Sequence, residues 1–218
     1  MIQTLETDLR RPDTIVIPEK PRIITGLAAL IIDVHTSEIR VIRERRDKPS
    51  TGRKAGELSV PIETRKVGED PEGNLYGALP EAFDRYDIHG RDIRRILERS
   101  LYHMEGNTYH PGFKQKLGDK IIHCEYAVVL YDGPNIEVEP FNSKEVGDAQ
   151  WVPMDRLLQS DVRSLAGHAV WHALSNGIIQ ENLRRYHQEP RSRLRLLPPG
   201  FSIPDIYHDR ELLVDVGK

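Results

Sequence analysis

Residues 58–86 constrain the fold more than any other part of the chain. Asp70 followed by Pro71 predicts a helix start, because an aspartate oxygen can cap free N–H groups and proline suits the first helical position. Pro80 lacks an N–H and is expected to interrupt this helix or to begin a second one. Four acidic residues surround the turn and the helix: Glu69, Glu72, Glu81 and Asp84. The segment therefore predicts a turn and a helix that carry carboxylates.

The spacing of these carboxylates indicates a metal site. Helix residues three or four apart share one face, so Glu81, Asp84 and Arg85 are expected on the same side. Magnesium prefers oxygen ligands and commonly takes one or two carboxylates together with substrate phosphates and water. Glu69 or Glu72 would lie near this pair. The alternative is a solvated acidic helix, which is common in a chain with 30% charged residues.

Strand patterns lie on both sides of this segment. Residues 27–33 form an apolar run that suits a buried strand, and residues 39–45 partly alternate between apolar and charged side chains. The turn at 35–38 joins them, which predicts a β-hairpin. Residues 120–131 are the longest strand candidate. Residues 136–139 and 150–152 are shorter ones.

Three further segments have helical patterns. Apolar residues recur at three- and four-residue intervals over 92–104. Asp161 is expected to cap a helix that Asn176 and Gly177 end, and residues 178–186 suit another helix. Strands mixed with a few helices predict an α+β fold.

The carboxylate segment and a later strand resemble the Nudix hydrolase family. The resemblance is carried by Gly68-Glu69, Glu81, Asp84 and the segment 149–155 around Trp151. It implies an α/β/α sandwich with a mixed sheet over residues 24–176, with a helical insertion near 89–104. Residues 1–23 would form an N-terminal arm, and residues 177–218 a C-terminal helix and an extended tail.

The chain departs from the family pattern at several positions. Ile62 and Glu63 stand in place of a glycine pair, and Gly77 and Ala78 stand where the family has Arg-Glu. An insertion of three residues would bring Pro80 and Glu81 into the Arg-Glu place. Arg85 would then replace the last glutamate, where its charge opposes a cation and favours a phosphate.

The resemblance implies cleavage of a pyrophosphate bond in a nucleotide or nucleoside diphosphate-linked substrate, with Mg²⁺ or Mn²⁺. The expected catalytic residues are Glu81, Asp84 and Glu69, and the expected metal ligands are Glu81, Asp84 and Glu72. The expected substrate-binding residues are Arg43, Arg45, Lys54 and Arg85, with a solvated basic loop as the alternative for the first three. A catalytically inactive Nudix-like module that senses a nucleotide or binds a protein is the competing interpretation.

Composition limits the class of protein. A length of 218 residues suits one domain, and 31 basic against 34 acidic residues give a net charge of −3, which argues against a protein that coats nucleic acid. Direct DNA binding is not expected, because no helix-turn-helix follows Asn176. No signal peptide or apolar run of about 20 residues is present, so no membrane contact and a cytoplasmic location are expected. A homodimer through the N-terminal arm and residues 92–104 is a further possibility.

Two other residue types have simpler interpretations. Cys124 lies in an apolar strand and is expected to pack there without reacting. His168 and His172 have the spacing of a metal-binding helix face, but the sequence offers no third ligand. We therefore interpret both as surface histidines or histidines with protein partners. Trp151 is interpreted as a core residue.

Overall fold

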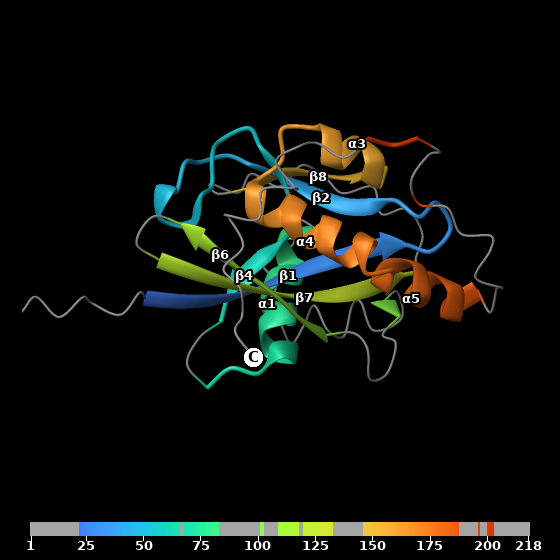
Figure 1. The fold of residues 1–218 in the computed structure, drawn as a ribbon, viewed down its shortest axis with the longest axis horizontal. Coiled ribbons are helices and arrows are strands. Elements are labelled where there is room, and N and C mark those ends of the chain that lie inside the picture. The colour runs from blue at the N-terminus through green and yellow to red at the C-terminus, as the bar shows by residue number, and fades with distance from the viewer. Residues whose placement is uncertain are drawn as a thin grey trace, which may run out of the picture.

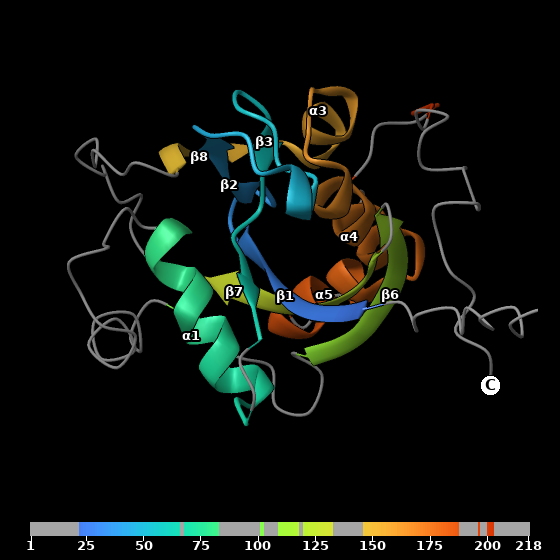
Figure 2. The same ribbon diagram turned by 90° about the vertical axis from the view of Figure 1, so that its left-hand side faces the viewer.

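The computed structural model describes residues 22–65, 68–82, 101–102, 109–117, 120–132, 146–187, 196 and 200–202. Within these ranges, an eight-stranded mixed sheet separates one helix from a group of three (Figure 1; Figure 2). The helices are α1 (Pro71–Ala82), α3 (Met154–Gln159), α4 (Ser164–Ser175) and α5 (Ile178–His187). Apolar residues of α1 pack on one face of the sheet, and those of α3, α4 and α5 pack on the other. The predicted α+β class and α/β/α layering are confirmed.

The centre of the sheet is a parallel pair of long strands. β1 (Arg22–Asp33) and β7 (Lys120–Tyr131) are paired along all 12 residues of each (Figure 1). Alternate side chains of β1 face opposite layers, so Leu27 belongs to the core under α1 and Ala28 to the core under α4. β1 starts five residues before the predicted run, because the pairing with β7 extends it.

The other edge of β1 is shared by two strands. β4 (Ile62–Thr64) pairs with Gly26–Ala28, and β2 (Ile39–Glu44) meets β1 at Ile39 and Ile32, which confirms the predicted hairpin. β3 (Leu58–Ser59) and β8 (Val146–Val152) both pair with β2. Trp151 of β8 packs against the core under α1, as predicted.

β7 carries two further strands. They are β5 (Leu101–Tyr102) and β6 (Tyr109–Leu117), both antiparallel to β7. β5 shows that the helix predicted over 92–104 is wrong at 101–102, because backbone pairing with β7 replaces the helical hydrogen bonds there. The other residues of that helix lie outside the described ranges, as do residues 136–139, 1–21 of the N-terminal arm and most of the C-terminal tail.

Helix α1 begins where the sequence predicts and continues further than expected. Oδ1 of Asp70 accepts a 2.7 Å hydrogen bond from the N–H of Gly73, which confirms the predicted cap. Pro80 does not interrupt the helix, which runs to Ala82. Leu75 and Leu79 are fully buried against the sheet, and this packing holds the last turn helical despite the proline.

The start of α4 also differs from the prediction. Asp161 is not its cap, because α4 begins at Ser164. Val162 instead forms an isolated bridge with Leu58: the N–H of Leu58 donates to the carbonyl of Asp161, and the N–H of Arg163 donates to the carbonyl of Leu58. The predicted end at Asn176 and Gly177 and the following helix α5 are confirmed.

None of the described helices has the length and apolar character needed to cross a membrane.

Cys124 is expected to be inert in the native protein. Its side chain is fully buried in β7, and burial raises the pKa of the thiol to about 12. Because the thiolate is the nucleophile, iodoacetamide at pH 8 should label Cys124 only after urea is added. Mass spectrometry of the two samples measures this, and rapid labelling without urea would contradict the placement of Cys124 in the core.

Candidate carboxylate site on helix α1

A short loop connects β4 to α1 and places Glu69 beside the first turn of the helix. Gly68 has a φ of 82°, a conformation that favours glycine, and Glu69 is half-buried. A Cβ atom added to Gly73 would lie 3.4 Å from Cγ of Glu69. The absence of a side chain at Gly73 thus leaves room for Glu69 against the helix.

A second glutamate approaches the same helix from the sheet. Glu63 of β4 pairs with Leu27 of β1, and paired residues of neighbouring strands point to the same face. Leu27 faces α1, so Glu63 does as well. A Cβ atom on Gly77 would lie 3.2 Å from Cγ of Glu63. The strand glutamate therefore lies where a helix side chain at residue 77 would otherwise extend.

The predicted ligand Glu81 lies on the same face of α1 as Gly73 and Gly77. Gly73, Gly77 and Glu81 follow one another at intervals of four residues in the continuous helix and so share one face. The structure describes the backbone of Glu72 and Glu81 but not their side chains, and Asp84 and Arg85 lie outside the described ranges. Among the side chains that are described, no three of His, Cys, Asp or Glu form a group that could hold a metal.

A buried amide lies on the same helix. Asn74 is fully buried, and neither its Oδ1 nor its Nδ2 has a hydrogen-bond partner within the described structure. Leaving such a group unsatisfied costs about 1–3 kcal/mol. Asn74 precedes Gly77 by three residues and Glu81 by seven, so it lies on the side of α1 that faces the carboxylates. Amide and carboxylate oxygens are the donors that Mg²⁺ and Mn²⁺ prefer, so these residues fit such an ion.

A third carboxylate on this face of the sheet pairs with an arginine. Arg65, just after β4, donates to Glu125 of β7, with a second contact of 3.3 Å from Nη1 to Oε1. Nδ1 of His123 lies 3.9 Å from the same carboxylate. We interpret the pair of Arg65 and Glu125 as a link between β4 and β7.

The predicted basic residues lie in and near the 45–57 loop, at different places. Nη1 of Arg43 donates a 2.7 Å hydrogen bond to the carbonyl of Gly56, and the exposed Arg45 lies close to Gly147 of β8. The side chain of Lys54 is 78% exposed, with Nζ 3.8 Å from Glu57. No described contact joins any of the three to α1.

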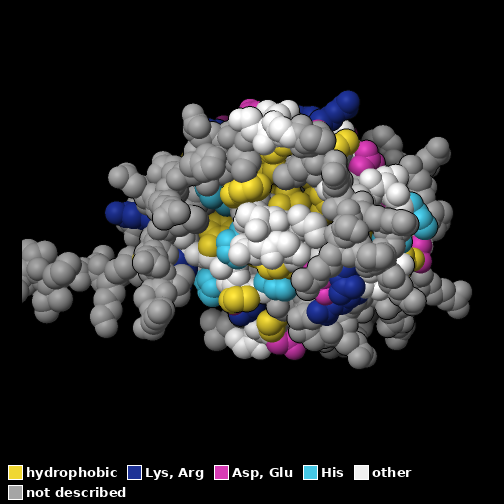
Figure 3. Space-filling view, turned by 45° about the vertical axis from the view of Figure 1, so that its right-hand side comes forward, with side chains coloured by type: hydrophobic (Ala, Val, Ile, Leu, Met, Phe, Trp, Pro, Cys, Tyr) yellow, Lys and Arg dark blue, Asp and Glu magenta, His cyan; other side chains and the backbone are white. Residues whose placement is uncertain are grey.

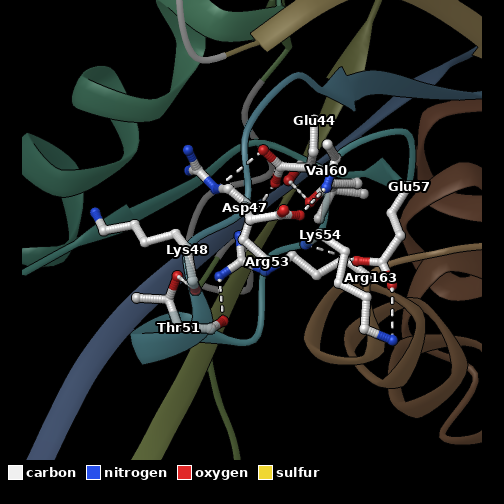
Figure 4. Close-up of polar contacts among 11 residues, drawn as sticks. Glu44, Asp47, Lys48, Thr51, Arg53, Lys54, Glu57, Val60 and Arg163 are labelled. Carbon is white, nitrogen blue, oxygen red and sulfur yellow. Dashed lines mark hydrogen bonds and ion pairs between the residues drawn. The ribbon is translucent and has the colours of Figure 1, made fainter.

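A buried ion-pair network holds this loop in place. Glu44 of β2 is 1% exposed and faces two guanidinium groups, those of Arg53 and Arg163 (Figure 4). The shortest distances are 3.0 Å to Nε of Arg53 and 3.4 Å to Nη1 of Arg163. Nη2 of Arg163 also donates to the carbonyl of Thr51. The network joins β2, the loop and the residue before α4.

Lys54 lines a cavity on the other side of the sheet. The cavity has a volume of about 350 Å³, and its walls include Gln115 and Lys116 of β6 and Ser164 of α4. Nε2 of the buried Gln115 donates a 2.9 Å hydrogen bond to Oγ of Ser164. Because α4 and α1 cover opposite faces, the structure does not bring Lys54 together with the α1 carboxylates.

The two helix histidines have protein partners. Nδ1 of His168 lies 2.7 Å from the carbonyl of Ser164, and Nδ1 of His172 lies 2.9 Å from the hydroxyl of Tyr126. Burial is the main cause that lowers the pKa of His172. Histidine side chains lie among apolar ones on the surface in Figure 3. These contacts agree with the interpretation of both residues as satisfied histidines.

Comparison with known proteins gives a likeness of low identity. No family model matches the chain, and none of the curated proteins compared matches it. Solved structures that resemble it include the E. coli ORF135 protein, at 13% identity over 71% of this chain and 90% of that chain, with a TM-score of 0.45. The Nudix hydrolase RenU of M. smegmatis has 12% identity, 72% and 84% coverage and a TM-score of 0.44. A C. elegans Ap4A hydrolase has 10% identity, 76% and 98% coverage and a TM-score of 0.42. Values this low assign neither a family nor an activity to the chain.

Three residues of this site were not predicted from the sequence: Glu63, Gly77 and Asn74. Glu63 and Gly77 each depart from the Nudix pattern, and the sequence shows both departures without showing that they face each other. The signal in the sequence is that a large residue replaces glycine at position 63 while glycine replaces a large residue at position 77. Asn74 carried no signal, because an asparagine in a helix is ordinarily exposed.

Proposed function

We propose that this protein hydrolyses a pyrophosphate bond in a nucleotide or nucleoside diphosphate-linked substrate, with Mg²⁺ or Mn²⁺ as cofactor. The observation that carries the proposal is that two acidic side chains lie along one side of α1: Glu69 from the loop before the helix and Glu63 from β4. Glu81, in the last turn, is proposed to join them because it follows Gly73 and Gly77 at intervals of four residues. Carboxylates that come from a strand, a loop and a helix and meet along one helix are typical of a cation site. The acidic residues of a solvated helix would all come from the helix itself.

Each acidic residue has a proposed role. A bound divalent cation would neutralise the diphosphate and lower the pKa of a water molecule. Glu81 and Asp84 are proposed ligands, and Glu72 in the first turn is proposed to support them. Glu69 is proposed to orient the site from the loop and to accept the proton of the attacking water. Phosphate oxygens would bind the guanidinium groups of Arg43, Arg45 or Arg85, with Lys54 as the least favoured candidate because of its place in the α4 cavity.

A module that binds a nucleotide without hydrolysing it is the second candidate. The observation in its favour is that Gly77 and Ala78 carry no carboxylate, and that Ala78 is fully buried on the side of α1 that packs against the sheet. Such a protein would keep the fold and a ligand site but lack the reaction. Homodimer formation and a cytoplasmic location stay predictions from the sequence.

Hydrolysis by the purified protein separates the two candidates. Dinucleoside polyphosphates, nucleotide sugars and nucleoside triphosphates are incubated with Mg²⁺, with Mn²⁺ or with a chelator, and the products are separated by chromatography. We expect at least one substrate class to be cleaved at a pyrophosphate bond, with the activity lost in chelator. Saturable binding of the same compounds without turnover in either metal would reject the hydrolase and favour the binding module.

A further inference from the structure

The strand residue Glu63 fills the space beside the helix residue Gly77, which has no side chain of its own. The distance of 3.2 Å from Cγ of Glu63 to a Cβ built on Gly77 is tighter than an ordinary contact, so a side chain at residue 77 would press against Glu63. In this chain the occupant comes from β4. The strand thereby delivers a carboxylate to the helix surface next to two helix positions, Gly77 and Ala78, that have none.

Pairing of β4 with its neighbours fixes the position of Glu63. β4 pairs with β1 through three residue pairs, with Glu63 in the middle one, and Arg65 after β4 is tied to Glu125 of β7. Two ties on either side of Glu63 limit the movement of its backbone. Glu63 is half-buried, so its carboxylate is partly withdrawn from water and interacts more strongly with a nearby cation.

Asn74 is an independent sign of a ligand at this place. A fully buried amide without a partner in the described structure destabilises the fold, and substitution by an apolar residue would remove that cost. Its position, three residues before Gly77, puts it one turn of α1 away from the Glu63 contact. An amide oxygen at that position completes a set of oxygen donors from two elements.

We infer that Glu63 of β4 and Asn74 of α1 are ligands of the divalent cation. The chain would thus hold the ion between a strand and a helix, with the carboxylate of residue 63 in place of the one carboxylate that the Nudix pattern has at residue 78. One carboxylate and one amide leave positions for water, for phosphate oxygens and for a further ligand in an octahedral shell. This inference rests on the proposed function for its cation, but it concerns residues outside the ligands predicted from the sequence.

Binding of Mn²⁺ alone tests the inference without any assay of activity. Free Mn²⁺ is measured by electron paramagnetic resonance during titration of the full chain and of Glu63→Gln, which keeps the shape and removes the charge. We expect the dissociation constant of Glu63→Gln to rise at least about tenfold, since even residues behind the ligands change metal affinity by that much. Asp161→Asn is the matched control, because Asp161 is exposed and lies on the α4 side of the sheet; its affinity should equal that of the parent.

Two more variants separate a ligand from a structural residue. Combining Glu63→Gly with Gly77→Glu moves the carboxylate from the strand to the facing helix position and should recover most of the affinity that Glu63→Gln loses. Asn74→Leu should raise the thermal unfolding midpoint and weaken Mn²⁺ binding. A higher midpoint with unchanged affinity would exclude Asn74 as a ligand and overturn the inference for that residue.

The remaining outcomes are also decisive. Unchanged affinity in Glu63→Gln, or no Mn²⁺ binding by the parent, overturns the inference. If the parent hydrolyses nucleotides while Glu63→Gln keeps full affinity, the proposed function stands and the inference fails. If Mn²⁺ binding depends on Glu63 but no substrate is cleaved, the inference stands and the hydrolase is rejected.

Discussion

Replacing Glu81 with glutamine is expected to lower turnover by roughly a hundred- to ten-thousand-fold, the range for loss of a group that acts directly in catalysis. Glutamine keeps the size of glutamate and removes the charge that a cation or a proton requires. Glu81 lies in the last turn of α1, beyond the residues Leu75 and Leu79 that anchor the helix in the core. The free energy of unfolding should therefore change by less than about 0.5 kcal/mol.

Steady-state kinetics on the best substrate, in Mg²⁺ and in Mn²⁺, measure this effect. Asp161→Asn again serves as the control for removal of one negative charge. A lower turnover with an unchanged Michaelis constant would place the role of Glu81 in the transition state. Equal turnover in the variant and the parent would remove Glu81 from the catalytic residues.

Replacing Arg163 with methionine is expected to lower the free energy of unfolding by about 3–5 kcal/mol, because it leaves a buried carboxylate short of a partner. Arg163 is 5% exposed, and it contacts Glu44 and the carbonyl of Thr51. Burial raises the pKa of Glu44, while Arg53 and then Arg163 oppose that rise. With Arg163 absent, the cost of keeping Glu44 ionised in the core increases.

The pH dependence identifies the cause. A carboxyl group with a raised pKa in the folded state is most favourable when protonated, and this contribution is lost as pH rises above its unfolded value. The defect of Arg163→Met should thus be large at pH 7 and shrink as pH falls towards 4.5, the ordinary pKa of the group. Urea unfolding at both pH values, followed by circular dichroism, measures it.

Arg184→Met supplies the comparison for an ion pair in water. Nη2 of Arg184 lies 2.7 Å from Oε1 of Glu181, but both side chains are more than a quarter exposed. Its loss should lower stability far less, because solvent screens exposed pairs. Similar losses for Arg163→Met and Arg184→Met would show that burial of the Glu44 network is not the cause.

The predictable parts of the fold depend on local chemistry. The cap at Asp70, the end of α4 at Gly177 and the hairpin from β1 to β2 follow from residues close in the sequence. The failures have distant causes. Leu101 joins a strand because it pairs with β7, and Asp161 does not cap α4 because the next residue, Val162, pairs with the distant Leu58.

The candidate site also has features that local sequence predicts and features that depend on distant contacts. Helical spacing places Gly77 and Glu81 on one face without knowledge of the sheet. The approach of Glu63 to Gly77 depends on the register of β4 against β1, which the sequence does not specify. Burial of Asn74 likewise depends on how α1 lies on the sheet. The placement of Lys54 on the α4 side follows from the path of a loop that the Glu44 network holds.

The parallel pairing of β1 and β7 has a consequence for how the chain acquires its structure. Residue 22 pairs with residue 120, and residue 33 with residue 131, so the middle of the sheet depends on contacts between distant parts of the sequence. Closing so long a loop costs entropy before the pairing compensates, which slows folding. During synthesis, the apolar stretch of β1 must wait for β7 to leave the ribosome. Refolding should therefore be slow, and chains that end before residue 120 should aggregate.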